Sequence, residues 1–190
     1  MAVWDNEGLD RLAVLAKTGD RNAFSKIVSM MMQPIVALTY KMTGDRETAK
    51  DLAQDTFIAA WSKLVDFRGE ARFSSWLYRI ASNKALNHLS SRSVKQAQLF
   101  DEASSDELQS CAGHDSPETV LIRQRLKEDV VEFLGTLPPK QRLAFELRFY
   151  KELSFEEIAQ VTNSALGTVK TNYRQAVAKL RQYAVQKGWR

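Results

Sequence analysis

The side chains best suited to chemistry lie near the C-terminus, on one face of a helix predicted over residues 168–185. That face carries hydroxyls, amides and cations that can bind DNA, namely Thr168, Lys170, Thr171, Arg174, Gln175 and Arg181. Arginine and lysine bind phosphate or guanine, glutamine binds adenine, and threonine contacts a phosphate or a thymine methyl group. Because a helix with such a front fits the major groove, the pattern predicts a surface for duplex DNA.

A helix-turn-helix over about residues 153–181 would position this face. The opposite side of the second helix is apolar at spacings of four, three and four, with Val169, Tyr173, Ala176 and Leu180. The preceding helix is predicted at Phe155–Val161, with Ser154 as its N-cap. Asn163 falls in the turn, where asparagine tolerates a positive φ. The alternative is a plain helical hairpin with a solvated basic face.

A second candidate surface lies on a helix predicted over Trp76–Ser90, with Ser74 or Ser75 as its N-cap. One line on it and the loop before it combine aromatic, basic and amide side chains, namely Arg68, Arg72, Phe73, Trp76, Arg79, Asn83 and Asn87. Flat side chains stack on unpaired bases and amides bind base edges, so the line predicts a site for single-stranded nucleic acid. Burial of Trp76 in the core is the alternative.

A third surface lies on a helix predicted from Asp45 or Arg46 to about Val65. Its buried face is expected to hold Ala53, Phe57, Ala60, Trp61 and Leu64. The opposite face is acidic around one isoleucine, with Asp51, Gln54, Asp55, Ile58 and Ser62. Acids around an apolar anchor are typical of a surface that attracts and holds a basic protein partner. An ordinary solvated face that happens to hold one isoleucine is the alternative.

Helical periodicity dominates the 190 residues, and with only 8 glycines and 4 prolines it predicts an all-α fold. The net charge of +4 is divided between two basic ends and an acidic middle. We therefore expect two small helical domains, at 1–92 and 119–190, joined by a flexible acidic linker at 93–118. The remaining predicted helices are Leu9–Lys17, Asn22–Thr43 with a kink or break at Pro34, Thr119–Leu134 beginning at Pro117 or Glu118, and Lys140–Tyr150.

Several classes of function have no support in the sequence. A single cysteine excludes an internal disulfide and suits a reducing cytoplasm, and no secretory signal precedes the first helix. Cys111 and His114 are half of a zinc site without another half. No catalytic constellation, Walker loop or dinucleotide motif is present. We therefore expect a cytoplasmic protein that is not an enzyme and has no metal, cofactor or small-molecule substrate.

Segments along both halves resemble the extracytoplasmic-function (ECF) sigma factors, the small members of the bacterial sigma-70 family. Residues 153–181 and the helix before them resemble region 4, with LSFEEIAQVTNSALGTVKTNYRQAVAKLR and LPPKQRLAFELRFY. Three earlier segments resemble regions 2.1, 2.2 and 2.3–2.4, with AFSKIVSMMMQPIVALTYKMTGD, DLAQDTFIAAWSKL and FRGEARFSSWLYRIASNKALNHL. One departure is Thr171-Asn172, where many relatives have Ser-Arg.

The resemblance implies a role for each surface. Region 4 would bind the double-stranded −35 promoter box, and region 2.2 would dock on a coiled coil of core RNA polymerase. Regions 2.3–2.4 would open the −10 element, with the loop and Asn83 capturing a flipped base. The acidic linker would thread the polymerase, and an anti-sigma factor would hold the chain inactive. The implied function is initiation of a specialised stress-response regulon; a sigma-like decoy for an anti-sigma factor and a simple repressor are the alternatives.

Overall fold

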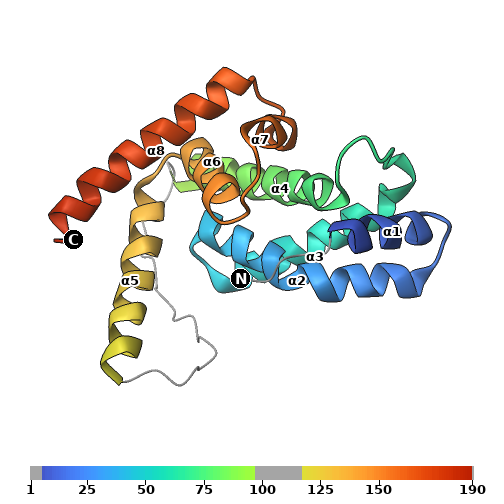
Figure 1. Cartoon of the computed structure of the whole chain (residues 1–190), viewed down its shortest axis with the longest axis horizontal. Coiled ribbons are helices and arrows are strands. Elements are labelled where there is room, and N and C mark those ends of the chain that lie inside the picture. Colours follow the sequence, from blue (N-terminus) through green and yellow to red (C-terminus); the bar gives the residue numbers. More distant parts are fainter. Residues whose placement is uncertain (1–5, 97–116, 190) are drawn as a thin grey trace.

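The computed structural model describes residues 6–96 and 117–189, which form helices and contain no strand. The predicted all-α class is confirmed (Figure 1). The elements are α1 (Asn6–Lys17), α2 (Arg21–Thr43), α3 (Arg46–Ser62), the 3₁₀ helix η1 (Leu64–Asp66), α4 (Phe73–Gln96), α5 (Pro117–Thr136), α6 (Pro139–Phe149), α7 (Phe155–Thr162) and α8 (Leu166–Gln186).

The first half of the chain is a bundle of α1 to α4, built around the long helix α2. Asp20 caps α2 by accepting from two backbone N–H groups of its first turn. Gly44 ends it in the left-handed conformation, with φ of 76° and its N–H donating to Tyr40 O at 2.7 Å. The helix runs through Pro34 without a break, so of the two predicted outcomes the break is wrong and the kink stays a prediction. Inside the bundle, the buried Thr39 hydroxyl lies 2.8 Å from Ala49 O and ties α2 to α3.

The second half packs α5, α6 and α8 around an aromatic cluster. Phe133, Leu137, Phe145 and Ala176 are buried at its centre. The far end of α8 is fastened to α5, because Lys187 Nζ lies 3.0 Å from Asp129 and 2.9 Å from Glu132.

The indole of Trp189 reinforces this fastening by donating to Asp129 Oδ2 at 3.2 Å. Hydrogen bonds to Glu132 and Asp129 raise the pKa of the Lys187 ammonium above its ordinary value. We call these ion pairs and the Trp189 bond the α5–α8 clasp.

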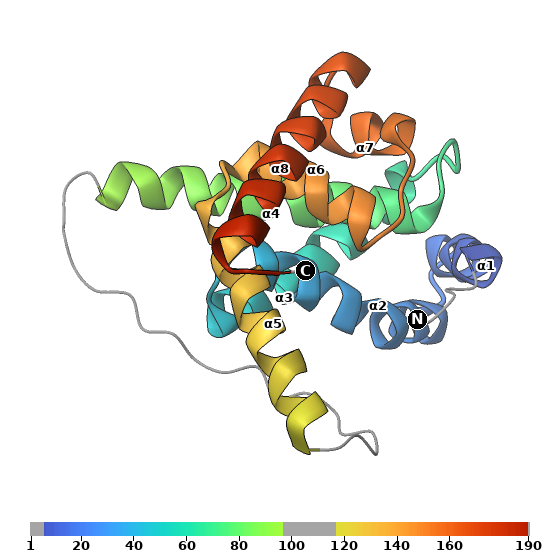
Figure 2. The same cartoon turned by 60° about the vertical axis from the view of Figure 1, so that its left-hand side comes forward.

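The two halves are packed against each other, with α7 lying on α4 and α6 near α2 (Figures 1 and 2). Leu143, Leu147, Ile158 and Val161 of the second half belong to the same apolar cluster as the core of the first. Helices α4 and α5 reach into both ends of the predicted linker, to Gln96 and from Pro117. The rest of that linker, with the half zinc site at Cys111 and His114, lies outside the described residues.

Candidate nucleic-acid and polymerase interface

Helices α7 and α8 form the predicted helix-turn-helix. The Ser154 hydroxyl accepts from Glu157 N at 3.1 Å, and the Glu157 carboxylate accepts from Ser154 N at 2.8 Å. This reciprocal pair is a capping box, which satisfies two backbone donors that a helix start leaves open. Asn163 occupies the turn in the left-handed conformation, with φ of 47°. The predicted cap and turn residue are therefore confirmed.

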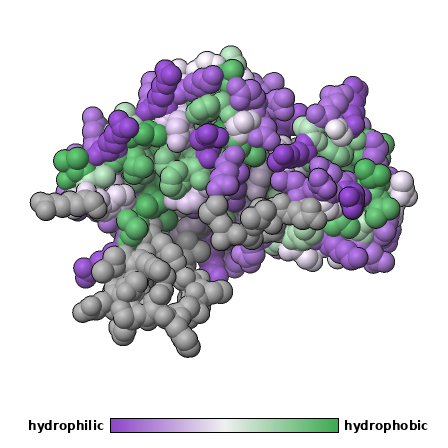
Figure 3. Space-filling model, in the orientation of Figure 1, coloured by the Kyte–Doolittle hydropathy of each residue, from purple (hydrophilic) through white to green (hydrophobic). Residues whose placement is uncertain are grey.

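Helix α8 has the two faces that its sequence predicts. Val169 and Ala176 are buried against α6 and α7, and Tyr173 and Leu180 are half-buried. Five of the six predicted DNA-binding residues are exposed, namely Thr168, Thr171, Arg174, Gln175 and Arg181. Lys170 is half-buried, with its ammonium 5.9 Å from the centre of the Phe155 ring. Hydrophilic side chains dominate the outer edge of α8 (Figure 3).

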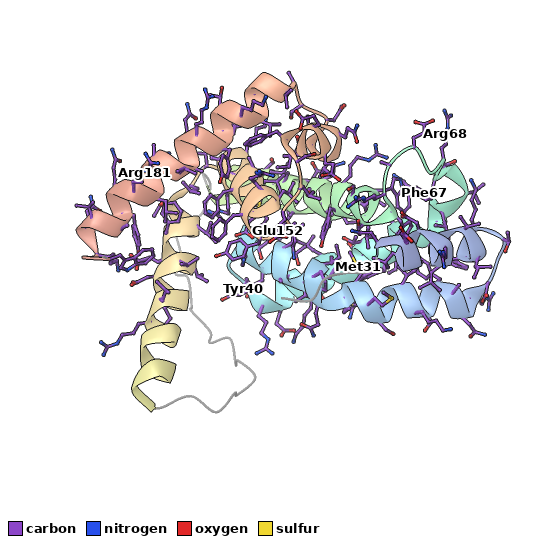
Figure 4. All side chains as sticks on the ribbon, in the orientation of Figure 1. Met31, Tyr40, Phe67, Arg68, Glu152 and Arg181 are labelled. Carbon is purple, nitrogen blue, oxygen red and sulfur yellow. The ribbon has the colours of Figure 1, made fainter. Side chains whose placement is uncertain are left out.

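Two of these residues have environments that bear on their use. Gln175 Oε1 accepts from Gln141 Nε2 at 2.7 Å, which leaves the Gln175 amide N–H groups to bind an acceptor. Arg181 projects from the outer side of α8, at the opposite end of the molecule from Arg68 (Figure 4). An α-helix rises about 1.5 Å per residue, so Arg181 lies roughly 20 Å along the axis from Thr168. The face is therefore long enough to follow a DNA groove and its flanking backbone.

The second predicted surface, on α4 and the loop before it, is only partly exposed to solvent. Arg79, Asn83 and Asn87 are exposed along α4, and Arg68 and Arg72 are exposed in the preceding loop. The expectation that Phe73 and Trp76 present stacking faces is wrong in this structure. Phe73 is fully buried and Trp76 is 9% exposed, because both pack with Phe67, with ring centres 5.3–5.4 Å apart. These aromatic rings support the loop from beneath and leave its basic side chains outside.

Helix α1 fixes the loop between α3 and α4. Asp10 Oδ1 accepts from Phe73 N at 2.7 Å, so the cap of α4 comes from another helix and not from Ser74 or Ser75, as predicted. Helix α4 accordingly begins three residues before the predicted start at Trp76. Lys17 Nζ donates to Phe67 O at 2.8 Å at the other end of the loop. The loop is thus held at both ends by side chains of α1.

Replacing Asp10 with alanine is expected to lower the free energy of unfolding by about 1 kcal/mol, because the first turn of α4 loses its cap. Asp10→Asn is the matched control, since its amide oxygen can still accept from Phe73 N. Chemical denaturation followed by circular dichroism measures both variants. Equal stability of Asp10→Ala and the unaltered chain would contradict the capping role.

The third surface, on α3, is exposed as predicted. Asp51, Gln54, Asp55 and Ser62 are on the outside, and Ile58 is 65% exposed between them. Asp55 Oδ2 lies 3.5 Å from Lys84 Nζ of α4, so α4 fixes one end of the acidic strip. Most of this isoleucine side chain is left uncovered by the rest of the chain, and its apolar surface would fit a protein partner.

Trp61 was expected in the core of the first half, and that expectation is wrong. It is 39% exposed and packs its ring on Phe24, with the centres 4.8 Å apart. Together with Arg21 the two rings line an open pocket of about 230 Å³. Val65 is also exposed, in η1 just after the end of α3, so Ile58, Trp61 and Val65 are three exposed apolar side chains on this segment. The spacing of three residues between Ile58 and Trp61 is the signal that could have placed Trp61 near the exposed face.

Comparison with known proteins agrees with this geometry in both halves. The family description "Sigma-70 region 2" matches residues 27–94, and "Sigma-70, region 4" matches residues 127–180. The RNA polymerase sigma-H factor of Pseudomonas aeruginosa is 33% identical over 186 residues, covering 90% of this chain and 93% of that protein. The chain belongs to the ECF group of the sigma-70 family.

Other relatives of this sigma factor extend the likeness. The ECF RNA polymerase sigma factor SigW of Bacillus subtilis (strain 168) is 32% identical over 170 residues, covering 87% of this chain and 91% of that protein. The structure of CnrH in complex with the cytosolic domain of CnrY has a TM-score of 0.68 and 26% identity, covering 96% and 99% of the two chains. A sigma factor RpoE from Bartonella quintana, solved with the anti-sigma factor NepR, has the same fold, with a TM-score of 0.68.

Membership of this family makes the chain an alternative sigma factor, a regulator that directs RNA polymerase in transcription initiation. None of its helices in the described ranges is long and apolar enough to cross a membrane. Within the same ranges no group of three or more histidine, cysteine or carboxylate side chains could hold a metal ion.

Proposed function

We propose that this sigma factor uses its three exposed surfaces in one process. The α3 face docks on core RNA polymerase, α8 binds the −35 box, and α4 with its preceding loop opens and holds the −10 element. In this scheme residues 1–92 and 119–190 are the functional domains and 93–118 connects them. The exposure of an isoleucine inside an acidic strip, on the segment that matches region 2, is the observation that carries the docking assignment.

At the −10 element, the exposed groups suit one unpaired base. Arg68 and Arg72 supply positive charge for the backbone, while the Asn83 amide can bind a base edge. Extruding a base from duplex DNA costs a few kcal/mol, which contacts in such a pocket can offset. Arg79 and Asn87 continue the same exposed line along α4. Since Phe73 and Trp76 are buried, we assign them to the support of this loop and not to stacking on the base.

At the −35 box, the N-terminal part of α8 reads bases and the distal part holds the backbone. Thr168, Thr171, Arg174 and Gln175 fall in its first ten residues, where a recognition helix reaches the base edges. Lys170 lies among them, but its ammonium is near Phe155, which suits a phosphate contact. Arg181 is about 20 Å from the start of this set, which suits a phosphate contact. Asn172 is half-buried beside them. Many relatives have an arginine at this position, so we expect the asparagine to change which −35 DNA sequence is preferred.

Purified chain mixed with core RNA polymerase is expected to produce run-off transcripts from its own promoter. That promoter would be found by mapping transcript starts after overexpression. The control is core polymerase alone on the same template, which should give no specific start. Failure of the chain to bind core polymerase would contradict this function.

An anti-sigma factor is the further partner that we propose. RpoE was solved in complex with the anti-sigma factor NepR, and CnrH was solved in complex with the cytosolic domain of CnrY. We also infer that the chain acts in the cytoplasm and is not an enzyme, since the polymerase would supply the chemistry. Affinity capture with the tagged chain from its own cells, followed by mass spectrometry, tests for the partner. A protein with a short cytoplasmic segment is expected in the captured fraction.

A further inference from the structure

A pair of glutamines joins α6 to the DNA-binding face of α8. Gln141 Nε2 donates to Gln175 Oε1 at 2.7 Å, across 34 positions of the sequence. Gln141 lies in the first turn of α6 and is half-buried, whereas Gln175 is exposed among the residues proposed to bind the −35 box. The bond therefore links a half-buried side chain of the supporting helix to a side chain that can meet DNA.

Both glutamines extend from backbone positions that are held in place. Gln141 N donates to Pro138 O at 2.9 Å at the start of α6. Ala176, which follows Gln175, is 0% exposed and belongs to the aromatic cluster around Phe145. With both backbones held, the side-chain bond also fixes the rotation of the Gln175 amide, which an exposed side chain would otherwise keep free.

The surroundings of Gln141 set the direction of this bond. Gln141 Oε1 is buried and has no hydrogen-bond partner in the described part of the chain. Turning that amide around would bury an NH₂ group with two unmet donors instead, and unmet buried N–H groups are rarer in folded proteins than unmet carbonyl oxygens. Gln141 is therefore the donor of the pair and Gln175 is the acceptor.

The direction of the bond decides what Gln175 can offer to a base. Its oxygen is turned toward α6, and Gln141 occupies one of the two acceptor sites of that oxygen. The nitrogen lies on the other side of the planar amide and keeps both of its N–H donors. Adenine needs a glutamine that accepts from N6 and donates to N7, whereas guanine presents two acceptors, N7 and O6, in the major groove. The pair thus suits guanine better than the adenine that glutamine usually binds.

We propose that Gln141 is a positioning residue that sets the base preference of Gln175 in the −35 box. It orients the Gln175 amide as a donor, so that this position of the helix-turn-helix selects guanine over adenine. The inference rests on the proposed contact of α8 with the −35 box. Gln141 is absent from the −35 residues predicted from the sequence, because it lies outside the recognition helix and acts through another side chain.

The test compares binding of the holoenzyme to promoter duplexes that carry each of the four bases in turn at every −35 position. The unaltered chain should have one position, sensitive to Gln175→Ala, at which guanine is bound more tightly than adenine. In Gln141→Glu the new carboxylate can only accept, so it should take an N–H of Gln175 and turn the Gln175 oxygen toward the DNA. The ratio of guanine to adenine affinity at that position should then fall about 5-fold or more.

A second variant and two controls separate this role from a loss of packing. Gln141→Met removes the donor and leaves the Gln175 amide free to turn. It should weaken binding to the guanine duplex about 2- to 12-fold, because one more side chain is ordered on binding, and it should reduce the preference without reversing it. Gln182→Glu adds the same negative charge at an exposed residue of α8 and should leave the ratio unchanged. Gln141→Glu should also leave it unchanged in a Gln175→Ala chain, since its effect passes through Gln175.

Two results would overturn this inference alone. They are a preference for adenine at the Gln175-sensitive position in the unaltered chain, and a ratio there that Gln141→Glu leaves unchanged. If Gln175→Ala relaxes no position while other −35 preferences remain, the assignment of Gln175 to a base fails together with the role of Gln141. If the holoenzyme has no preference at any −35 position, the proposed use of α8 fails, and the inference with it.

Discussion

Ile58→Arg is expected to weaken binding to core RNA polymerase by at least about 30-fold, since truncation of a central apolar anchor typically costs 2 kcal/mol or more. The substitution also puts a positive charge three residues after Asp55 and seven after Asp51, on the same face as these two acids, which are proposed to attract a basic partner. Because Ile58 is 65% exposed, its replacement should change the free energy of unfolding by no more than about 0.5 kcal/mol. Fluorescence anisotropy of the labelled chain with core polymerase gives the affinity.

The control for this experiment is Val185→Arg, which makes the same kind of change at a residue of α8 that is 80% exposed. Its polymerase affinity should match that of the unaltered chain. If both variants bind equally well, Ile58 is not an anchor and the docking face lies elsewhere. If Ile58→Arg alone fails to bind and still melts at the same temperature, the loss belongs to the interface.

Arg174→Ala is expected to reduce promoter binding by the holoenzyme about 5- to 150-fold, the effect of 1–3 kcal/mol for one arginine on a base. A base contact would also relax the preference at one −35 position. Loss of a phosphate contact would instead weaken binding to all sequences alike. It would also reduce the slope of log affinity against log salt concentration by about one. Lys170→Ala is expected to show the second behaviour, because its ammonium lies near Phe155 and away from the tip of the face.

Arg125→Ala on α5 serves as the control, since this exposed arginine lies outside the helix-turn-helix. Binding to promoter duplexes with single −35 changes, at several salt concentrations, distinguishes the two kinds of contact. A decoy that only sequesters an anti-sigma factor predicts no loss of activity in either α8 variant. Unchanged transcription with Arg174→Ala and Lys170→Ala together would favour that alternative.

Local features of the helix-turn-helix could be predicted because their causes lie within a few residues. Ser154 and Glu157 are three positions apart, and the turn at Asn163 needs only its own backbone. The two faces of α8 follow from its period, since one side of that helix is covered. The exposed α3 face at Asp51 and Ile58 was predictable for the same reason.

The errors arose where burial depends on distant parts of the chain. Helix α4 is covered by the first bundle and also by α7, so periodicity alone could not show that Trp76 is buried. Its cap comes from Asp10, 63 residues earlier, and no local signal marks such a partner. The angular position of Trp61 around the helix axis predicted that it lies in the core. Helix α3 ends one residue later, and the ring packs beside Phe24 instead.

The contact between the halves was not predicted, because an acidic, polar middle suggests separation. The residues that make it look ordinary in the sequence. Lys41 and Glu146 are 105 positions apart, and each lies on a helix with other charges. Only their burial together in the fold marks them as a pair.

The α5–α8 clasp gives the recognition helix a mechanical property. Helix α8 has 21 residues, so at 1.5 Å per residue it is a rod about 31 Å long. The start of this rod is the end proposed to read DNA, while its far end is joined to α5 through Lys187 and Trp189. The rod is also held near its start, where Val169 and Ala176 are buried against α6 and α7. Helices α5 to α8 therefore keep fixed angles to one another, and the direction in which α8 would enter a groove is set by this whole unit.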